Sequence, residues 1–146
     1  MKKIFLLYTL LSYSICLILS LIALFTLEIN FKSIFVFLLS LVTIYSVYLV
    51  FKNKWVKYSL TYLAILNLLQ SFAFHVLGFS YKFILGSNLY LYYFIKNNDT
   101  FLKTSFNLLE TNLYINYSNS DDLLIGINLI HFLLFIGFNH HIRKAK

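Results

Sequence analysis

The chain has 146 residues, of which 60% are hydrophobic and only 12% are charged. A soluble domain averages about 45–50% apolar and about 25% charged residues, and one of this length could not bury so much apolar surface. The same numbers exclude intrinsic disorder, and the single cysteine excludes a disulfide framework or a four-thiolate zinc site. The composition therefore predicts a small all-α integral membrane protein.

Four segments, taken in chain order, are long and apolar enough to cross a bilayer as helices, which requires about 20 residues each. They comprise residues 4–27, 33–51, 55–79 and 123–139. We interpret the first as an uncleaved helix rather than a signal peptide, because its apolar run is long and no small-x-small cleavage site follows it. The sequence thus predicts one membrane domain, residues 1–146, with four transmembrane helices.

Basic residues determine the predicted orientation of these spans. With four spans, one side of the membrane holds eight basic residues and no acidic one: Lys2, Lys3, Lys52, Lys54, Lys57, Arg143, Lys144 and Lys146. The positive-inside rule assigns that side to the cytoplasm or the mitochondrial matrix, so both termini are predicted to lie there. The net charge of +7 then belongs to one membrane face, which favours membrane lipids and other membrane-protein subunits as partners and disfavours nucleic acid.

Residues 80–122 connect the third and fourth spans and are expected on the opposite, outer side. Within them, residues 82–95 are aromatic and apolar but too short to span comfortably, which indicates an interfacial or re-entrant piece. Asn97 and Asn98 predict a turn, and Asp121 and Asp122 are expected to cap the fourth span.

A helical pattern follows that turn, in residues 101–115. Its large apolar residues recur at spacings of four, three and four: Leu102, Phe106, Leu109 and Leu113. This spacing is typical of one face of an amphipathic helix. We therefore expect an amphipathic helix that lies flat on the outer leaflet or on a partner protein.

Small residues form stripes along one face of each predicted span. In the first span the stripe comprises Thr9, Ser12, Cys16, Ser20 and Ala23, and in the second it comprises Ser33, Val36, Ser40, Thr43 and Val47. Small residues let helix backbones approach closely in a membrane. The stripes predict helix contacts, either within the chain or with neighbouring subunits.

The candidate site is a polar layer near the middle of the bilayer. Counting 1.5 Å per residue along the predicted helices brings the deepest polar side chains to similar depths: His131, Gln70, Asn128, Asn67 and Ser71. An ionisable residue inside a membrane is a functional candidate by default, and His131 is the only one predicted to lie so deep. It is either a proton relay or ligand, or a neutral imidazole hydrogen-bonded to Asn128, Gln70 or a serine.

Catalytic, cofactor and metal sites are not predicted. Paired carboxylates are absent from the spans, Cys16 lacks a partner for nucleophilic chemistry, and no phosphate-binding or zinc-protease motif occurs. Haem ligation by His75 and His131 is disfavoured because their predicted depths differ. The sequence therefore predicts a protein that is not an enzyme and holds no cofactor.

The residue usage is rich in amino acids with A/T-rich codons, such as Phe, Tyr, Ile, Asn and Lys. In this bias the chain is similar to hydrophobic subunits encoded by A/T-rich mitochondrial genomes. We therefore expect a non-catalytic structural or accessory subunit of a larger membrane complex, such as a respiratory-chain or ATP-synthase assembly of the mitochondrial inner membrane. The alternative is a small channel, transporter or membrane-perturbing effector of a bacterial cytoplasmic membrane or a phage.

Overall fold

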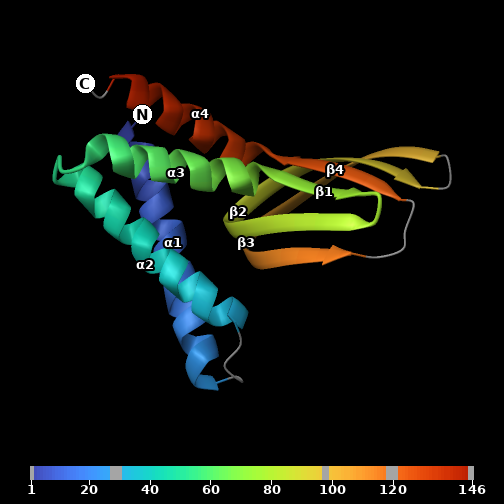
Figure 1. Cartoon of the computed structure of the whole chain (residues 1–146), viewed down its shortest axis with the longest axis horizontal. Coiled ribbons are helices and arrows are strands. Elements are labelled where there is room, and N and C mark those ends of the chain that lie inside the picture. Colours follow the sequence, from blue (N-terminus) through green and yellow to red (C-terminus); the bar gives the residue numbers. More distant parts are fainter. Residues whose placement is uncertain (1, 27–30, 97–98, 118–121, 145–146) are drawn as a thin grey trace. The chain divides into compact units, whose positions relative to one another are not determined.

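A computed structural model describes residues 2–26, 31–96, 99–117 and 122–144 of the chain. In these residues four helices accompany a four-stranded antiparallel sheet, which is an α+β fold (Figure 1). The elements, in chain order, are α1 (Lys2–Thr26), α2 (Phe31–Phe51), α3 (Val56–Ser71), β1 (Phe72–Val76), β2 (Phe79–Lys96), β3 (Asp99–Tyr117), β4 (Leu123–Asn128) and α4 (Leu129–Lys144).

The chain forms two compact units, which we call the helical unit and the sheet unit. The helical unit comprises residues 1–65 and 134–146, and the sheet unit comprises residues 66–133. The boundaries fall inside α3 and α4, so each of these helices begins in one unit and ends in the other.

The prediction of an all-α protein with four transmembrane helices is wrong. Two helical segments, Lys3–Thr26 and Phe31–Phe51, are long and apolar enough to cross a membrane, and they coincide with the first two predicted spans. Helices α3 and α4 have only 16 residues each, or roughly 24 Å, against the roughly 30 Å thickness of a hydrocarbon core. The rest of the third and fourth predicted spans, residues 55–79 and 123–139, is β1 with its turn and β4.

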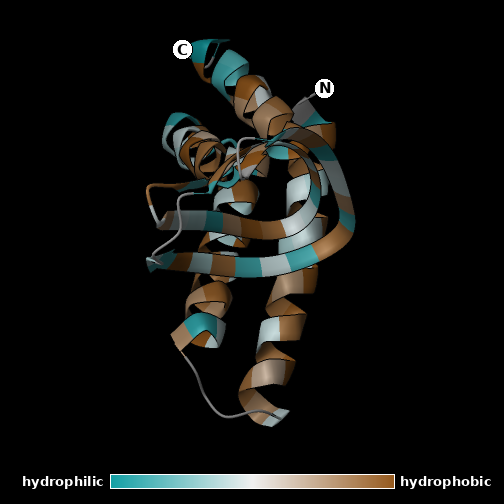
Figure 2. Ribbon diagram, turned by 90° about the vertical axis from the view of Figure 1, so that its right-hand side faces the viewer, coloured by the Kyte–Doolittle hydropathy of each residue, from teal (hydrophilic) through white to brown (hydrophobic). Residues whose placement is uncertain are grey.

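In the helical unit, the small-residue stripes of α1 and α2 are buried. The buried set comprises Thr9, Ser12, Cys16 and Ser20 on α1, with Val36, Ser40, Thr43 and Val47 on α2. Large apolar side chains are exposed on both helices, and most of the ribbon of each helix has the brown colour of hydrophobic residues in Figure 2. This division matches close backbone packing through small residues and leaves the bulky side chains exposed.

Strand β1 begins where the apolar run of the third predicted span continues past Ser71. The strand is short, and Val76 pairs with Phe79 across a two-residue turn. The turn residues Leu77 and Gly78 both have positive φ, 50° and 82°. Positive φ at both positions is typical of a type I′ turn, whose twist matches that of the flanking strands. A hairpin therefore replaces the end of the expected helix.

Strand β2 changes its neighbour halfway along, and this makes the sheet curl. Its first residues pair with β1 and residues 90–95 pair with β4, while β1 and β4 also pair with each other. Gly86, with a φ of 115°, lies between the two halves of β2 and adopts a backbone conformation that favours glycine. Ala73, Ile84 and Tyr90 form the small core that the curl encloses.

Strand β3 pairs with β2 from Asp99 to Tyr117, so the amphipathic helix predicted for residues 101–115 is wrong. The pairing contains a bulge, because Leu108 and Leu109 lie opposite Ser87 alone. The interfacial or re-entrant piece predicted for residues 82–95 is likewise strand β2. The expected turn at Asn97–Asn98 and the expected cap at Asp121 lie outside the described residues.

Register divides the sheet into two faces. Six paired residues form one row across all strands: Ile115, Tyr81, Phe74, Ile125, Tyr93 and Leu102. We call the face with this row the apolar face, and the opposite face, with Lys82, Asn88, Tyr90 and Glu110, the network face. Successive side chains along each strand point to opposite faces of the sheet, so each strand contributes to both faces.

Candidate functional site: a buried polar network in the sheet unit

The five residues of the predicted polar layer all lie in the sheet unit, and none lies in α1 or α2. Asn67, Gln70 and Ser71 are in the last turns of α3, Asn128 ends β4, and His131 is in the first turn of α4. All five are buried, with at most 1% of their surface exposed. They gather where helices meet strands rather than at a common depth in a four-helix bundle.

His131 and Asn67 form a direct hydrogen bond between α4 and α3. The distance from His131 Nδ1 to Asn67 Oδ1 is 2.8 Å, and because an amide oxygen only accepts, Nδ1 carries the proton. Burial lowers the pKa of His131 to about 4. Ser71 Oγ donates to the Asn67 carbonyl at 2.7 Å and closes the end of α3. At neutral pH His131 is therefore an uncharged imidazole.

Gln70 ties the end of α3 to strand β2. Its Oε1 accepts a hydrogen bond from the backbone N–H of Leu85 at 2.7 Å, beside the bend at Gly86. The hydroxyl of Tyr90 donates to the Gln70 carbonyl at 3.3 Å. A buried side-chain amide thus replaces a strand neighbour at the point where β2 changes partners.

Asn128 joins β2 to the start of α4. Its Oδ1 accepts from the backbone N–H groups of Leu89 and Ile130, both at 3.2 Å. The bond to Ile130, the second residue of α4, is that of a helix N-cap. Asn128, and not the expected Asp122, therefore begins the last helix.

Sequence reasoning missed a second cluster, around the carboxylate of Glu110 on the network face. Lys82 Nζ donates to Oε1 at 2.7 Å and Asn112 Nδ2 at 3.3 Å. Asn88 Nδ2 donates to Oε2 at 2.7 Å and Asn107 Nδ2 at 3.1 Å. Burial raises the pKa of Glu110, but the hydrogen bond and charge of Lys82, with the amides of Asn112 and Asn88, outweigh it and lower the pKa.

Alternation along the strands was the signal that could have found this cluster. Glu110 and Asn112 are two residues apart and share a face of β3, and the bulge brings Asn107 to the same face. On β2, Lys82 and Asn88 are six residues apart and share that face too. If the same segments were helices, these polar residues would not share one face.

Aromatic rings surround the cluster. The rings of Tyr90 and Tyr92 stack with centroids 4.9 Å apart, and Lys82 Nζ lies 5.7 Å from the centroid of Tyr90. Burial, followed by the charge of Glu110, raises the pKa of Tyr92 to about 12. Gly126 faces the Tyr92 ring so closely that an added Cβ would lie 2.5 Å from two ring carbons.

The described residues offer no reacting constellation. No group of three His, Cys, Asp or Glu side chains among them could hold a metal ion. His131 is buried and bonded to an amide, and Glu110 is held ionised by four donors, so neither is poised as an acid or base at neutral pH. The network acts as a scaffold: it connects α3, α4 and three strands through buried polar bonds.

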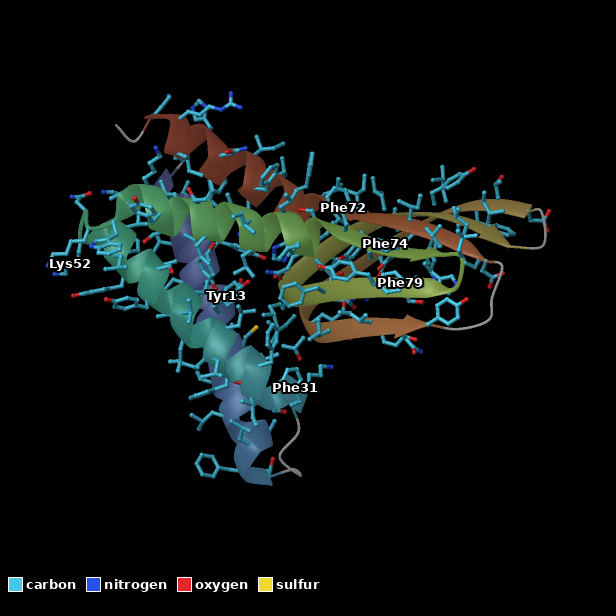
Figure 3. All side chains as sticks on the ribbon, viewed as in Figure 1. Tyr13, Phe31, Lys52, Phe72, Phe74 and Phe79 are labelled. Carbon is cyan, nitrogen blue, oxygen red and sulfur yellow. The ribbon has the colours of Figure 1, made fainter. Side chains whose placement is uncertain are left out.

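Two grooves lie on the surface of the sheet unit. The first, of about 560 Å³, is lined by Tyr92, Phe94, Phe101, Leu102, Lys103, Ser105 and Leu124. The second, of about 530 Å³, lies against the apolar face and is lined by Leu68, Leu69, Phe72, Ala73, Phe74, Tyr81 and Ile125. Figure 3 shows Phe72 and Phe74 on β1 and Phe79 on β2.

Comparisons with protein-family models, with curated proteins and with solved structures find no match for this chain.

Proposed function

We propose that this protein is a non-catalytic accessory subunit of a larger membrane complex. Helices α1 and α2 form its membrane anchor, and the sheet unit binds partner subunits through the apolar face. The observation that carries the proposal is the apolar row across all strands of the sheet, because a lone soluble domain rarely exposes a contiguous apolar surface of this kind.

The surfaces of α1 and α2 support the membrane anchor. Only 33% of the residues in each apolar window are buried, whereas the core helix of a soluble protein is mostly buried. Large apolar side chains project from both helices, among them Leu11 and Phe25 on α1 and Leu38 on α2. Lipid is the solvent in which such surfaces are stable.

The lysines that flank this pair of helices support an orientation. Lys2 and Lys3 begin α1, and Lys52, Lys54 and Lys57 follow α2. The positive-inside rule places all five on the cytoplasmic or matrix side. With two spans in place of four, residues 56–144 stay on that side, which reverses the side expected for residues 80–122.

Exposure of the apolar face supports the binding of partner subunits. Leu102 is 85% exposed and Ile115 62%, at the two ends of the six-residue row. Strand β3 is also an edge: its described residues pair with β2 and with no other described strand. An unpaired strand edge beside exposed apolar side chains is a common site for association with another chain.

The residue usage supports an organelle origin, because A/T-rich genomes of organelles encode hydrophobic subunits of respiratory-chain and ATP-synthase complexes. We accordingly propose the mitochondrial inner membrane as the location, with a bacterial cytoplasmic membrane as the alternative. The channel alternative lacks support in α1 and α2, where the hydroxyls of Thr9, Ser20, Thr43 and Ser46 donate to carbonyls of their own helix. Hydroxyls engaged in this way do not form a polar conduction path.

Native gels after extraction in a mild detergent test the proposal. The unaltered protein is expected to migrate with a large assembly, and the double variant Ile115→Gln with Ile125→Gln is expected to leave it while remaining folded and membrane-bound. Leu77→Asn is the control, because Leu77 is even more exposed, at 86%, but lies in the β1–β2 turn, off the apolar row. Migration of the unaltered protein as a lone small oligomer that conducts ions in liposomes would contradict the proposal.

A further inference from the structure

The first groove combines apolar walls with one positive charge. Tyr92 and Phe94 of β2, Phe101 of β3 and Leu124 of β4 supply the walls from the network face. Its volume, about 560 Å³, lies within the range of small-molecule binding sites, about 300–1,000 Å³. A space of this size and lining suits a single flexible hydrocarbon chain.

Lys103 and Ser105 supply the polar end of the groove. They are two residues apart on β3, so both side chains lie on the network face. The structure gives neither side chain a hydrogen bond or ion pair with another described residue, whereas Lys82 is paired with Glu110 at 2.7 Å. The groove lining contains no acidic residue, so the charge of Lys103 is not neutralised there.

Gly126 shapes the wall beside these residues. It pairs with Tyr92 across β4 and β2, and its missing Cβ allows the Tyr92 ring to lie against the strand. The ring also stacks on Tyr90, with the two centroids 4.9 Å apart. The groove is therefore a built feature with a supported aromatic wall.

We propose that this groove binds a long-chain fatty acid, with the hydrocarbon chain along the aromatic walls and the carboxylate at Lys103 and Ser105. The charge of the groove decides the class of ligand: an ammonium and a hydroxyl donate to a carboxylate, and charge-assisted hydrogen bonds of this kind are the strong ones. The apolar walls take up the methylene groups, each of which adds about fourfold in affinity when buried. The proposal does not depend on the accessory-subunit function.

Photo-crosslinking of the full chain in nanodiscs tests the proposal, with a diazirine-bearing palmitic acid as the probe. Crosslinks located by mass spectrometry are expected within residues 92–94 and 101–105 and at Leu124. Unlabelled palmitic acid should compete, while hexadecanol, which partitions into the same bilayer but has no charge, should compete about tenfold less well. Equal competition by the alcohol, or crosslinks confined to α1 and α2, would overturn the proposal.

Two variants separate the contribution of the Lys103 charge to binding from that of the apolar walls. Lys103→Gln should lower crosslinking about tenfold and abolish the preference for acid over alcohol, whereas Lys57→Gln, a lysine outside the sheet unit, should change neither. Gly126→Ala should lower crosslinking of acid and alcohol probes alike, because it pushes the Tyr92 ring into the groove. An unchanged acid preference in a folded Lys103→Gln protein would refute the role of the lysine.

Discussion

The hydroxyl side chains of the helical unit and the amide side chains of the sheet unit make hydrogen bonds of different reach. In the helical unit, Thr9, Ser20 and Ser46 donate to carbonyls three or four residues earlier in their own helix. In the sheet unit, Gln70 and Asn128 accept from backbone N–H groups 15 and 39 residues away. Local bonds leave a helix free to be solvated by lipid, whereas distant bonds hold one particular tertiary arrangement together.

The comparison predicts that the sheet unit loses stability when the packing of its side chains is changed. Gly126→Val is expected to cost about 3 kcal/mol in the free energy of unfolding of the sheet unit, because the added atoms collide with the stacked Tyr92 and Tyr90 rings. Denaturant unfolding in mixed micelles, followed by far-ultraviolet circular dichroism, measures the loss. Unchanged stability of this variant would show that the aromatic stack does not fill the space described.

A matched pair of variants tests the contrast between distant and local bonds. Asn128→Ala should cost about 2 kcal/mol, because it removes the cap of α4 and leaves the N–H of Leu89 without its acceptor. Thr9→Val removes one hydroxyl bonded to its own helix and should cost well under about 1 kcal/mol. Equal losses in the same unfolding measurement would remove the distinction between the units.

Acid should weaken the sheet unit through His131. Its pKa is about 4 in the folded protein and about 6.5 in the unfolded chain, so the unfolded state binds the proton more readily between these values. Stability is therefore full above pH 6.5 and falls by about 1 kcal/mol between pH 6.5 and 5.5. His131→Gln should be less stable at neutral pH but should lose this part of the pH dependence, and an unchanged acid slope would contradict the assignment.

The smallest expected effect is an increase in the stability of the sheet unit. Leu77 has a φ of 50° at the first turn position of the β1–β2 hairpin, where asparagine is tolerated better than leucine. Leu77→Asn should stabilise the sheet unit by about 0.5 kcal/mol. Leu77→Val, which is β-branched, should have the opposite effect in the same unfolding assay.

Sequence reasoning located α1 and α2 because each helix is specified by residues within its own segment. A long apolar run with a stripe of small residues specifies both the helix and its contact face, and the stripes through Cys16 and Thr43 are indeed buried. The third and fourth spans failed because hydropathy alone does not distinguish a helix from an apolar strand. Aromatic residues concentrated in β2, such as Tyr90, Tyr92 and Tyr93, favour a strand over a helix.

The spacing of Leu102, Phe106, Leu109 and Leu113 shows why periodicity misled for β3. Steps of four, three and four fit one face of a helix, but they also fit a strand with one bulge. Even steps keep a side chain on the same face, and the extra residue at Leu108–Leu109 changes the parity once. A two-residue bulge opposite Ser87 therefore produces the same spacing without a helix.

The polar layer shows a different limit. His131, Asn67 and Ser71 are linked by hydrogen bonds, but the argument from equal depth does not explain this, because they meet at the end of α3 and the start of α4. Asn67 was expected only as a member of the layer and is the direct partner of His131. Glu110 and its amides depend on the register of β2 and β3, which a single sequence does not specify.

The central claim is that the chain crosses the membrane twice and that its sheet unit shares a side with both termini. Labelling of a Leu108→Cys, Cys16→Ser protein in sealed vesicles with a membrane-impermeant maleimide tests this claim most directly, because Leu108 is 76% exposed in the middle of residues 80–122. The account predicts that Leu108→Cys reacts only from the side on which tags at both termini are accessible. Reaction only from the opposite side would contradict it.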